Sequence, residues 1–428
     1  MPDTLQDWLT YLESLHPKTI ALGLERVAQV KQRLNLQPDF PIITVGGTNG
    51  KGSVCAMLES MLHAAGYKVG CYTSPHLLDY NERVRIAKKQ ASDAELCASF
   101  EQIEQARGAA FSGESEIPLT YFEFGTLAAM QCFISHKVEV AILEVGLGGR
   151  LDAVNVFDSD CAVVTGVDMD HMDYLGDTRE QIAFEKAGIF RAGKVAVFGD
   201  PDMPEVIAAE AQRIGAKLWR IGSGFGFTPH QGQWDYRGAA GSRNSLPFPS
   251  LRGAYQLNNA SSVLAALDAL KDKLPVSMEA VRRGLVEVSL PGRFQVLPGW
   301  PQLILDVAHN PQAARSLAQN LAALPPARTF AVFAMLRDKD MAGVVRALKG
   351  QVNVWLVAGL DVPRGASAAE LASVLATEGE TAEIQAFSSV ENALHHACNV
   401  AAENDRIAAF GSFYTVADVM RVRGLRHT

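Results

Sequence analysis

The sequence lacks features that several large classes of protein require. Its six cysteines lie far apart, with no C-x-x-C pair or zinc-finger spacing, so we expect neither a disulfide framework nor a cysteine zinc site. No apolar run is long enough to cross a bilayer, and the acidic amino terminus is unlike a secretory signal. The formal net charge of -8 argues against binding nucleic acid by phosphate neutralisation. These absences predict a protein of the reducing cytoplasm that contacts neither membrane nor nucleic acid.

The composition is that of an ordinary globular protein, and the length predicts two domains. With 48% hydrophobic and 20% charged residues the chain can form a packed core, and its 428 residues exceed what one core usually organises. Continuous apolar runs suit parallel strands covered on both faces; they lie at residues 42–45, 68–72, 138–143, 161–165 and 195–198. The Gly-, Ser- and Pro-rich residues 218–250 predict an irregular or β-rich excursion, and helices are expected at 258–271 and 278–286.

The most informative segment is the glycine-rich turn TVGGTNGKGS at residues 44–53, between a predicted strand and a helix expected to begin at Ser53. In that position backbone N–H groups and the helix dipole can bind phosphate, and Lys51 adds a positive charge. The match to G-x-x-x-x-G-K-[ST] is imperfect, because Val45 takes the first glycine position and Gly52 the hydroxyl position. Magnesium must then be held by Ser53 or by a side chain from elsewhere. A turn kept for packing alone is the alternative interpretation.

A domain boundary is predicted at Leu290-Pro291-Gly292-Arg293, where Pro-Gly follows a predicted helix. Beyond it we expect strands at 303–305, 329–333, 354–357 and 406–410, alternating with helices at 312–324, 341–348, 368–375 and 390–403. The predicted fold class is therefore α/β. Residues 1–290 are expected to form a P-loop mononucleotide-binding domain with a mostly parallel sheet, residues 291–296 a linker, and residues 297–428 a smaller Rossmann-like domain.

Polar residues end two further apolar strands, at the edge where open α/β sheets bind ligands. Glu144 is placed to reach a magnesium ion that bridges nucleotide phosphates, and His171 could hold a second. As alternatives, Glu144 is a solvated loop charge, His171 a hydrogen-bonding residue and Ser74 an ordinary turn serine. Lys186 alone is typical of a surface lysine. If it were shielded from water, its lowered pKa would let the neutral amine form a carbamate near the metal.

Taken together, these residues resemble the folylpolyglutamate synthase family, most closely its bifunctional dihydrofolate synthase members, which are related to the muramyl ligases. The resemblance covers the chain nearly end to end, and the shared order of many short segments argues against coincidence. The matching segments are Lys18–Ile20, Leu22–Glu25, Gly47–Gly52, Thr73–His76, Asn81–Val84, Thr120–Glu123, Glu144–Arg150, Asp170-His171, Glu185–Ile189, Leu290–Phe294, Asp306–Pro311 and Gly411–Phe413.

The resemblance implies an ATP site with bound magnesium. It gives the ATP contacts as Thr48, Asn49, Gly50, Lys51, Gly52, Ser53, Asn259, Arg293 and Asp306. It gives Ser74 and Glu144 as ligands of one magnesium ion and His171 as a ligand of a second, with a monovalent cation as a further candidate. Lys186 matches the family's carbamylated lysine. The predicted catalytic residues are Lys51, Lys186 and His309.

The resemblance also implies the substrate sites. The pteroate pocket would be lined by Leu22, Gly23, Leu24, Glu25, Thr120, Tyr121, Phe122, Glu123, Leu151, Asp152 and Ala153, with Arg83 as a further candidate. His309 and Ser412 would receive glutamate in the second domain, across a catalytic cleft between the domains. Alternatively, the segment Asp306–Pro311 could merely cap the following helix, since Asn-Pro often begins one.

The implied reaction is the ATP-dependent addition of L-glutamate to 7,8-dihydropteroate, giving dihydrofolate, and to reduced folates, giving polyglutamates, through an acyl phosphate. The partners are small-molecule substrates, and we expect a monomer. Rival hypotheses are a folylpolyglutamate synthase without dihydropteroate activity, another amide ligase on the same scaffold, and a non-catalytic folate- or nucleotide-binding protein. The glycine-rich turn alone would also fit a phosphotransferase, which differs from a ligase because it leaves phosphate on its substrate.

Overall fold

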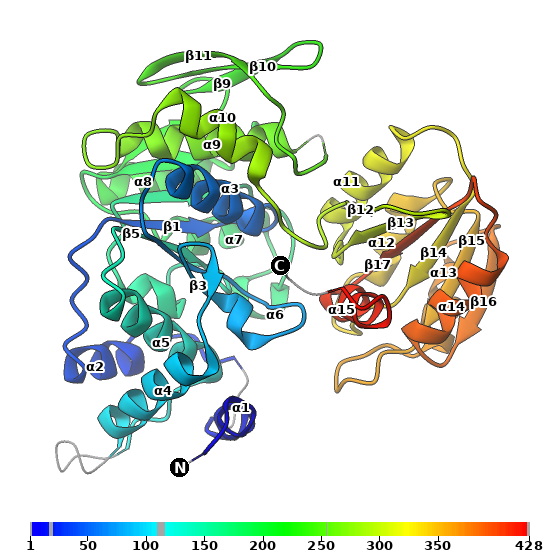
Figure 1. Cartoon of the computed structure of the whole chain (residues 1–428), viewed down its shortest axis with the longest axis horizontal. Coiled ribbons are helices and arrows are strands. Elements are labelled where there is room, and N and C mark those ends of the chain that lie inside the picture. The colour runs from blue at the N-terminus through cyan, green and yellow to red at the C-terminus, as the bar shows by residue number, and fades with distance from the viewer. Residues whose placement is uncertain (1, 17–19, 109–115, 254, 426–428) are drawn as a thin grey trace. The chain divides into compact units, whose positions relative to one another are not determined.

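The computed structural model describes residues 2–16, 20–108, 116–253 and 255–425. The chain folds into two compact units, one of residues 1–249 with 257–288 and the other of residues 250–256 with 289–428 (Figure 1). The short segment 250–256 therefore groups with the second unit, although the chain returns to the first unit after it.

An eight-stranded sheet organises the first unit, in the order β4-β3-β2-β5-β1-β6-β7-β8. Six neighbouring strands of this sheet are mutually parallel, namely β2, β5, β1, β6, β7 and β8. The strands β3 and β4 add an antiparallel edge. Every residue of β1, β2, β5 and β6 is buried, which explains their continuous apolar sequences. The strands are β1 (Ile42–Gly46), β2 (Val69–Tyr72), β3 (Val84–Ile86), β4 (Lys89–Gln90), β5 (Val140–Glu144), β6 (Cys161–Val164), β7 (Val195–Phe198) and β8 (Lys217–Arg220).

Helices cover both faces of this sheet, with α3 and α10 on one side and α4 and α5 on the other (Figure 1). Helix α3 begins at Lys51, two residues before the predicted start at Ser53, because Gly50 already turns the chain into the helix. The helices of the first unit are α1 (Leu5–Ser14), α2 (Glu25–Arg33), α3 (Lys51–Ala64), α4 (Asp93–Arg107), α5 (Tyr121–Ser135), α6 (Met172–Leu175), α7 (Arg179–Ala187), α8 (Glu205–Ile214), α9 (Gln256–Ala269) and α10 (Met278–Glu287), with 3-10 turns η1 (Tyr80–Arg83) and η3 (Ala153–Val156).

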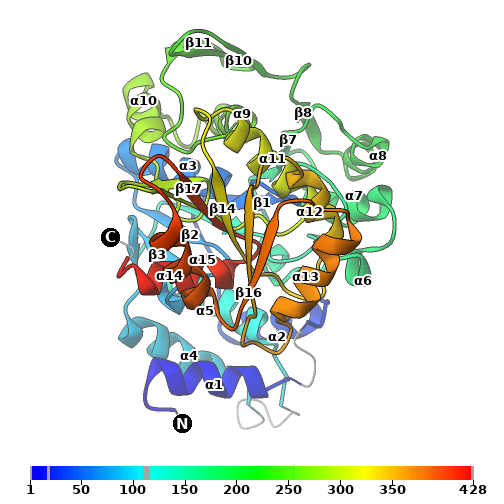
Figure 2. The same ribbon diagram turned by 90° about the vertical axis from the view of Figure 1, so that its right-hand side faces the viewer.

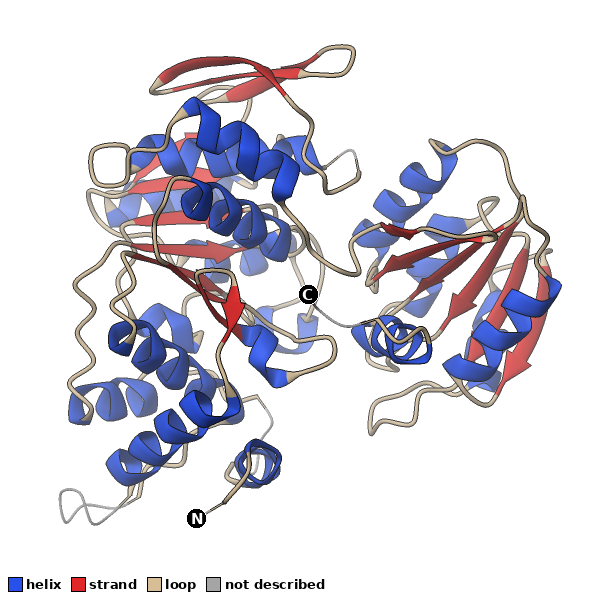
Figure 3. Cartoon of the chain, viewed as in Figure 1, coloured by secondary structure: helices blue, strands red, loops and turns tan. Residues whose placement is uncertain are grey.

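The predicted excursion at 218–250 is β-rich. Its first residues belong to β8 of the large sheet, and the rest form a separate antiparallel sheet of β9 (Gly226–Pro229), β10 (Trp234–Gly238) and β11 (Gly241–Leu246) (Figure 3). Asp268 on α9 anchors this small sheet, because its buried carboxylate accepts a hydrogen bond from the Tyr236 hydroxyl at 2.9 Å and pairs with Arg243 at 2.6 Å.

A six-stranded sheet organises the second unit, in the order β12-β13-β17-β14-β15-β16, with only β12 antiparallel to its neighbour. Figure 2 shows α12 and α13 on one side of the sheet and α14 and α15 on the other. The elements are β12 (Gln295–Leu297), β13 (Gln302–Asp306), α11 (Pro311–Ala322), β14 (Thr329–Phe333), α12 (Met341–Leu348), β15 (Val354–Ala358), α13 (Ala368–Thr377), β16 (Glu383–Phe387), α14 (Val390–Val400), β17 (Arg406–Phe410) and α15 (Phe413–Val422).

The predicted α/β fold class is confirmed, with a large mostly parallel sheet followed by a smaller Rossmann-like unit. Each unit has its own apolar core. Across the described part of the chain, no helix has both the length and the apolar character to span a bilayer.

Candidate active site

The glycine-rich turn between β1 and α3 packs closely against its neighbours at two glycine positions, where a side chain would not fit. Gly47 and Gly50 have φ angles of +139° and +90°, values that favour glycine. A Cβ at Gly47 would lie 1.9 Å from Thr165 Oγ1, and one at Gly50 would lie 2.7 Å from Asn259 Oδ1. The predicted ATP contact Asn259, on α9, is thus brought against the loop although it lies more than two hundred residues later in the sequence.

Hydrogen bonds to the strand β6 and the segment after it fix the shape of this turn. Thr48 N donates to Gly166 O at 2.9 Å, and Thr48 Oγ1 accepts from Asp168 N at 3.0 Å. The Thr165 hydroxyl donates to Asn49 O at 2.6 Å. The side chain of Thr48 therefore holds the loop in place, and the backbone of the loop is preorganised rather than mobile.

The end of this turn has the features of a phosphate site. The Lys51 ammonium lies over the loop, where it donates to Gly47 O at 2.9 Å and to Thr48 O at 3.2 Å. Lys51 is also the first residue of α3, a helix of 14 residues, so the N–H groups of the first helical turn and the positive end of the helix dipole lie beside it. Ser53 follows in the first turn and is buried. This arrangement fits a bound nucleotide triphosphate tail.

Glu144 and Ser74 come together at the carboxyl edge of the large sheet. Glu144 is the last residue of β5, and Ser74 lies two residues after the neighbouring parallel strand β2, in which Tyr72 pairs with Leu143. Ser74 N donates to the Glu144 carboxylate at 3.0 Å, and Glu144 is only 5% exposed. Because Glu144 also pairs in register with Val45 of β1, its carboxylate lies beside the glycine-rich turn. The alternative of a solvated loop charge is wrong for Glu144.

His171 lies in the segment after β6, on the other side of β1. It adopts a left-handed backbone with φ of +52° at the start of α6, and its Nε2 lies 3.8 Å from the Asp170 carboxylate. In the described residues no three or more His, Cys, Asp or Glu side chains are grouped so that they could hold a metal. Magnesium fits Ser74 and Glu144 because it is normally bound by one or two carboxylates together with phosphate oxygens and water.

Lys186 on α7 is buried, with 4% of its surface exposed, so the interpretation as a surface lysine is wrong. Burial, with a smaller effect from the Lys51 charge, lowers the pKa of Lys186 to about 7, while Asp170 and Asp152 oppose the shift. A large fraction of this amine is therefore neutral near pH 7. A buried lysine that is partly neutral at neutral pH is a candidate for covalent chemistry.

The three segments predicted to line the pteroate pocket converge. Gly23 N donates to Leu151 O at 3.2 Å, which joins the first segment to the third. Arg26 then links the first segment to the second, because its guanidinium pairs with Glu123 at 2.8 Å and donates to Ala21 O at 2.7 Å. Sequence reasoning missed Arg26, whose partner lies 97 residues away.

Two carboxylates among the predicted pteroate-binding residues accept hydrogen bonds from backbone N–H groups. Glu123 accepts from Thr120 N at 2.7 Å in a capping box at the start of α5. Asp152 accepts from Leu147 N at 2.8 Å and from Val154 N at 3.0 Å, and burial raises its pKa to about 7. Both residues therefore hold the walls of the site in shape.

Aromatic rings surround Arg83, the less central pteroate candidate. Its guanidinium lies over the rings of Tyr80 and Tyr121, at 5.3 and 5.4 Å, and its Nε donates to His76 Nδ1 at 2.8 Å. Phe122 lies nearby, with its ring 5.8 Å from that of Tyr72. These contacts bring the predicted Thr120–Glu123 segment to the same region as the loop after β2.

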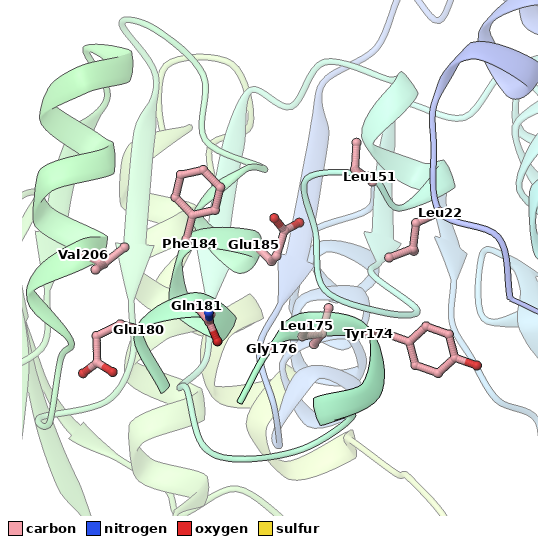
Figure 4. Close-up of a pocket in the computed structure, with 10 residues that line it drawn as sticks. All are labelled: Leu22, Leu151, Tyr174, Leu175, Gly176, Glu180, Gln181, Phe184, Glu185 and Val206. Atoms are coloured by element: carbon pink, nitrogen blue, oxygen red, sulfur yellow. The ribbon is translucent and has the colours of Figure 1, made fainter. Parts of the chain in front are cut away.

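A pocket of about 530 Å³ opens beside the first and third of these segments (Figure 4). Figure 4 shows Leu22 and Leu151 next to each other at one end and Val206 at the other, with residues of α6 and α7 between them. Leu22 and Leu151 are the predicted pteroate residues among its walls, which are Leu22, Leu151, Tyr174, Leu175, Gly176, Glu180, Gln181, Phe184, Glu185 and Val206. The mixture of apolar walls and a few polar groups is typical of a small-molecule site.

In the second unit, predicted residues gather where β13 ends. Asp306 accepts from Phe294 N and from Ala308 N, both at 2.8 Å. Burial raises the pKa of its carboxyl group, and the charge of Arg293 opposes that shift. The Arg293 guanidinium lies over the Phe413 ring at 5.1 Å. Phe413 belongs to the matching segment Gly411–Phe413 but was not among the predicted site residues.

His309 and Ser412 follow the neighbouring parallel strands β13 and β17, so the two predicted glutamate-binding residues lie at one edge of the sheet. The His309 and Phe413 rings are 6.1 Å apart. Ser412 is buried, and its hydroxyl caps α15 by accepting from Thr415 N at 3.0 Å. Asn310 likewise caps α11, so this segment does cap the following helix, as the alternative interpretation held.

Comparison with known proteins gives consistent results. Residues 45–267 match the family model described as "Mur ligase middle domain", and residues 292–413 match "Mur ligase, glutamate ligase domain". The chain is 47% identical over 426 residues to the dihydrofolate synthase/folylpolyglutamate synthase of Escherichia coli K12, covering 99% of this chain and 96% of that protein.

Solved structures agree over the whole chain. The structure of E. coli FolC in complex with DHPP and ADP superposes with a TM-score of 0.93 and 47% identity, covering 99% of this chain and 98% of that one. The bifunctional folylpolyglutamate synthase/dihydrofolate synthase of Yersinia pestis, complexed with AMPPNP and a Mn ion, has a TM-score of 0.91 and 49% identity with coverage of 99% and 98%.

Proposed function

The chain belongs to the dihydrofolate synthase/folylpolyglutamate synthase family, and we propose that it is an ATP-dependent ligase that adds L-glutamate to 7,8-dihydropteroate and to reduced folates. The first addition gives dihydrofolate and the second gives polyglutamates. The observation that carries the proposal is the grouping of the Lys51 ammonium, the buried Glu144 carboxylate and the buried Lys186 amine around one glycine-rich turn. A reaction at a nucleotide phosphate uses positive charge beside the phosphates and a carboxylate for the metal ion, which these groups can supply.

We assign the nucleotide to the first unit. Residues 48–53 would cradle the phosphates, with Asn259 against the loop, and we also assign Arg293 and Asp306 to ATP. Ser74 and Glu144 would hold one magnesium ion and His171 a second, with a monovalent cation as a further cofactor. Bound magnesium supplies positive charge that neutralises phosphate oxygens.

We assign a carbamate to Lys186. Its pKa of about 7 leaves a neutral amine that can attack carbon dioxide, forming an N–C bond and releasing a proton. The product is an anion in place of a cation. It would lie near Asp170 and Asp152, whose charges already act on this amine, and would favour cation binding there.

The first step brings two anions together, because the pteroate carboxylate must attack the γ-phosphorus of ATP. The new bond gives an acyl phosphate as the bond to ADP breaks. Lys51 and the N–H groups of the turn offset the negative charge that builds on the phosphoryl oxygens. The hydrogen bonds of Thr48 and Asn49 hold the turn in one conformation. Its N–H groups are therefore already oriented toward the phosphoryl oxygens, and the turn needs little reorganisation during the step.

The second step forms the amide. The neutral amine of glutamate attacks the acyl carbon, phosphate leaves and a proton is lost. We assign His309 and Ser412 to the incoming glutamate, and the pteroate to the walls formed by residues 22–25, 120–123 and 151–153 with Arg83. Orientation of the two reactants can supply about 7–11 kcal/mol of the barrier reduction.

The domain roles follow from these assignments: residues 1–290 for ATP and pteroate, 291–296 as the linker, and 297–428 for glutamate. We further propose a cytoplasmic location, which the six free cysteines favour, and a monomer.

Product mass tests the proposal. The protein is incubated with MgATP and L-glutamate, first with dihydropteroate and then with a reduced folate, and the products are weighed. A mass gain of one glutamyl residue in both cases is expected. Addition to the reduced folate alone would reduce the proposal to a folylpolyglutamate synthase, and phosphate retained on the substrate would replace it with a phosphotransferase. Lys51→Ala should abolish both additions.

A further inference from the structure

Arg85 on β3 uses its whole guanidinium group to join three segments of the first unit. Its Nε and Nη2 donate to the Glu59 carboxylate, the shortest contact being 2.9 Å. Nη1 donates to Thr73 Oγ1 at 3.1 Å and to Glu82 O at 2.9 Å, and Nη2 also reaches Cys71 Sγ at 3.3 Å. All five N–H groups of an arginine thus have an acceptor.

Two of these acceptors, on Glu59 and Thr73, belong to segments that lead to the nucleotide site. Glu59 lies on α3, the helix that begins at the glycine-rich turn, and is 4% exposed. Thr73 directly precedes Ser74, whose backbone N–H is bonded to Glu144. Arg85 therefore connects the phosphate-binding helix to the strand end that carries the proposed magnesium ligands.

The loop from residue 73 to residue 82 is held at both ends by the same arginine. At its far end the Glu82 carboxylate accepts from Leu77 N, Leu78 N and Asp79 N at 2.7 to 2.9 Å, which folds the loop onto Glu82. The carbonyl of Glu82 then accepts from Arg85. A lysine could replace the charge of Arg85, but its single ammonium group could not span these acceptors.

We propose that Arg85 is a positioning residue that sets the distance between the phosphate-binding turn and the Ser74–Glu144 pair, and so controls how well magnesium is held with the nucleotide. The inference rests on the proposed function, because it takes Ser74 and Glu144 as the magnesium ligands. Arg85 itself contacts α3 and the loop, not the reacting groups. Residues that orient metal ligands typically change metal affinity or activity by roughly 10-fold to 100-fold when replaced.

The test is the magnesium dependence of Arg85→Lys. Glutamate-dependent ADP release is measured against magnesium concentration at saturating ATP, and we expect half-maximal activity at roughly 10-fold to 100-fold more magnesium, with recovery at high concentration. Calorimetric binding of AMPPNP gives a readout that does not depend on turnover. The affinity measured with magnesium should fall, while the affinity measured without metal should stay unchanged.

Arg107→Lys is the matched control. Arg107 on α4 is 2% exposed and bonds Glu104, Glu116 and the Tyr11 hydroxyl, so its replacement disturbs a second arginine network, away from the turn. It should lower the unfolding temperature and leave the magnesium dependence unchanged. If Arg85→Lys does not fold, Glu59→Gln removes the charge of the same ion pair and should produce the same shift.

A Ser74→Ala variant separates the two proposals. A magnesium shift in Ser74→Ala, with wild-type magnesium dependence in both Arg85→Lys and Glu59→Gln, overturns the role of Arg85 and leaves the metal assignment standing. No shift in any of the three variants overturns the metal assignment itself. An equal shift in Arg107→Lys would show a general effect of destabilisation and would also overturn the role of Arg85.

Discussion

Each unit ends an inner strand with a carboxylate, and the two carboxylates are held in different ways. Glu144 at the end of β5 accepts from Ser74 N, which follows a neighbouring strand. Asp306 at the end of β13 accepts from Phe294 N before its own strand and from Ala308 N after it. The first arrangement joins two strand ends across the sheet, whereas the second fixes the local course of the chain.

A second difference between the two units concerns how their polar site residues affect the stability of the fold. In the first unit Lys186 is buried at an energetic cost, because burial opposes its charge. In the second unit Ser412 and Asn310 cap helices, which stabilises the fold directly. Replacing Lys186 should therefore stabilise the protein, whereas replacing Ser412 or Asn310 should destabilise it, and the following variants test how site residues of the two units affect stability.

Glu144→Gln should have the largest effect. The Gln side chain can still accept from Ser74 N but has lost the charge that attracts magnesium, so glutamate-dependent ADP release should fall on the order of 10²–10³-fold. The thermal unfolding temperature should change little. A variant that unfolds well below the wild type would show that Glu144, like Asp306, mainly supports the fold.

Lys186→Met should lower activity and stabilise the protein. The folded-state pKa of about 7 lies below the ordinary value of 10.5, so the unfolded state binds the proton more tightly. Buried Lys186 therefore destabilises the folded state fully below pH 7, and this destabilisation disappears as the pH rises toward 10.5. In buffer free of carbon dioxide and metal, the variant should therefore gain more in unfolding temperature at pH 6 than at pH 9.

The control for this pH dependence is Lys194→Met. Lys194 is 45% exposed and pairs with Asp160 at the surface, so its removal relieves no buried charge. It should not raise the unfolding temperature at either pH. An equal gain for Lys186→Met at pH 6 and pH 9 would mean that only the added apolar contact matters.

The sequence was sufficient for the inner strands and the glycine-rich turn, because continuous apolar runs and loop glycines are local signals. It was not sufficient for β16, an edge strand whose Glu383 is exposed and which therefore lacks an apolar run. Nor could it show that Lys186 is buried or that Arg26 and Arg85 connect the walls of the site, because those facts depend on residues distant in the chain. The roles of the site residues remain predictions.

Asp306→Asn should destabilise the second unit. Asn has one acceptor oxygen for two backbone N–H donors, so the NH₂ group would face either Phe294 N or Ala308 N. An unsatisfied buried donor costs about 1–3 kcal/mol, measurable in denaturant unfolding. Asp340→Asn is the control, because Asp340 caps α12 through one oxygen, to Gly343 N, which Asn retains. If both variants were equally stable, the local role of Asp306 would be wrong.

Ser412→Ala should have the smallest effect on stability, about 1 kcal/mol for the lost cap of α15. Ser412→Asp separates capping from glutamate binding, because Asp is an equally good cap but its charge repels a carboxylate substrate. This variant should have a raised KM for glutamate. Because Ser412 is buried, the added charge also lowers stability, so the KM is measured well below the unfolding temperature of the variant. Ser389→Ala, which removes the cap of α14, should match Ser412→Ala in stability with an unchanged KM. A normal KM for glutamate in Ser412→Asp would show that Ser412 only caps the helix. The assignment of Ser412 to glutamate binding in the second unit would then be wrong.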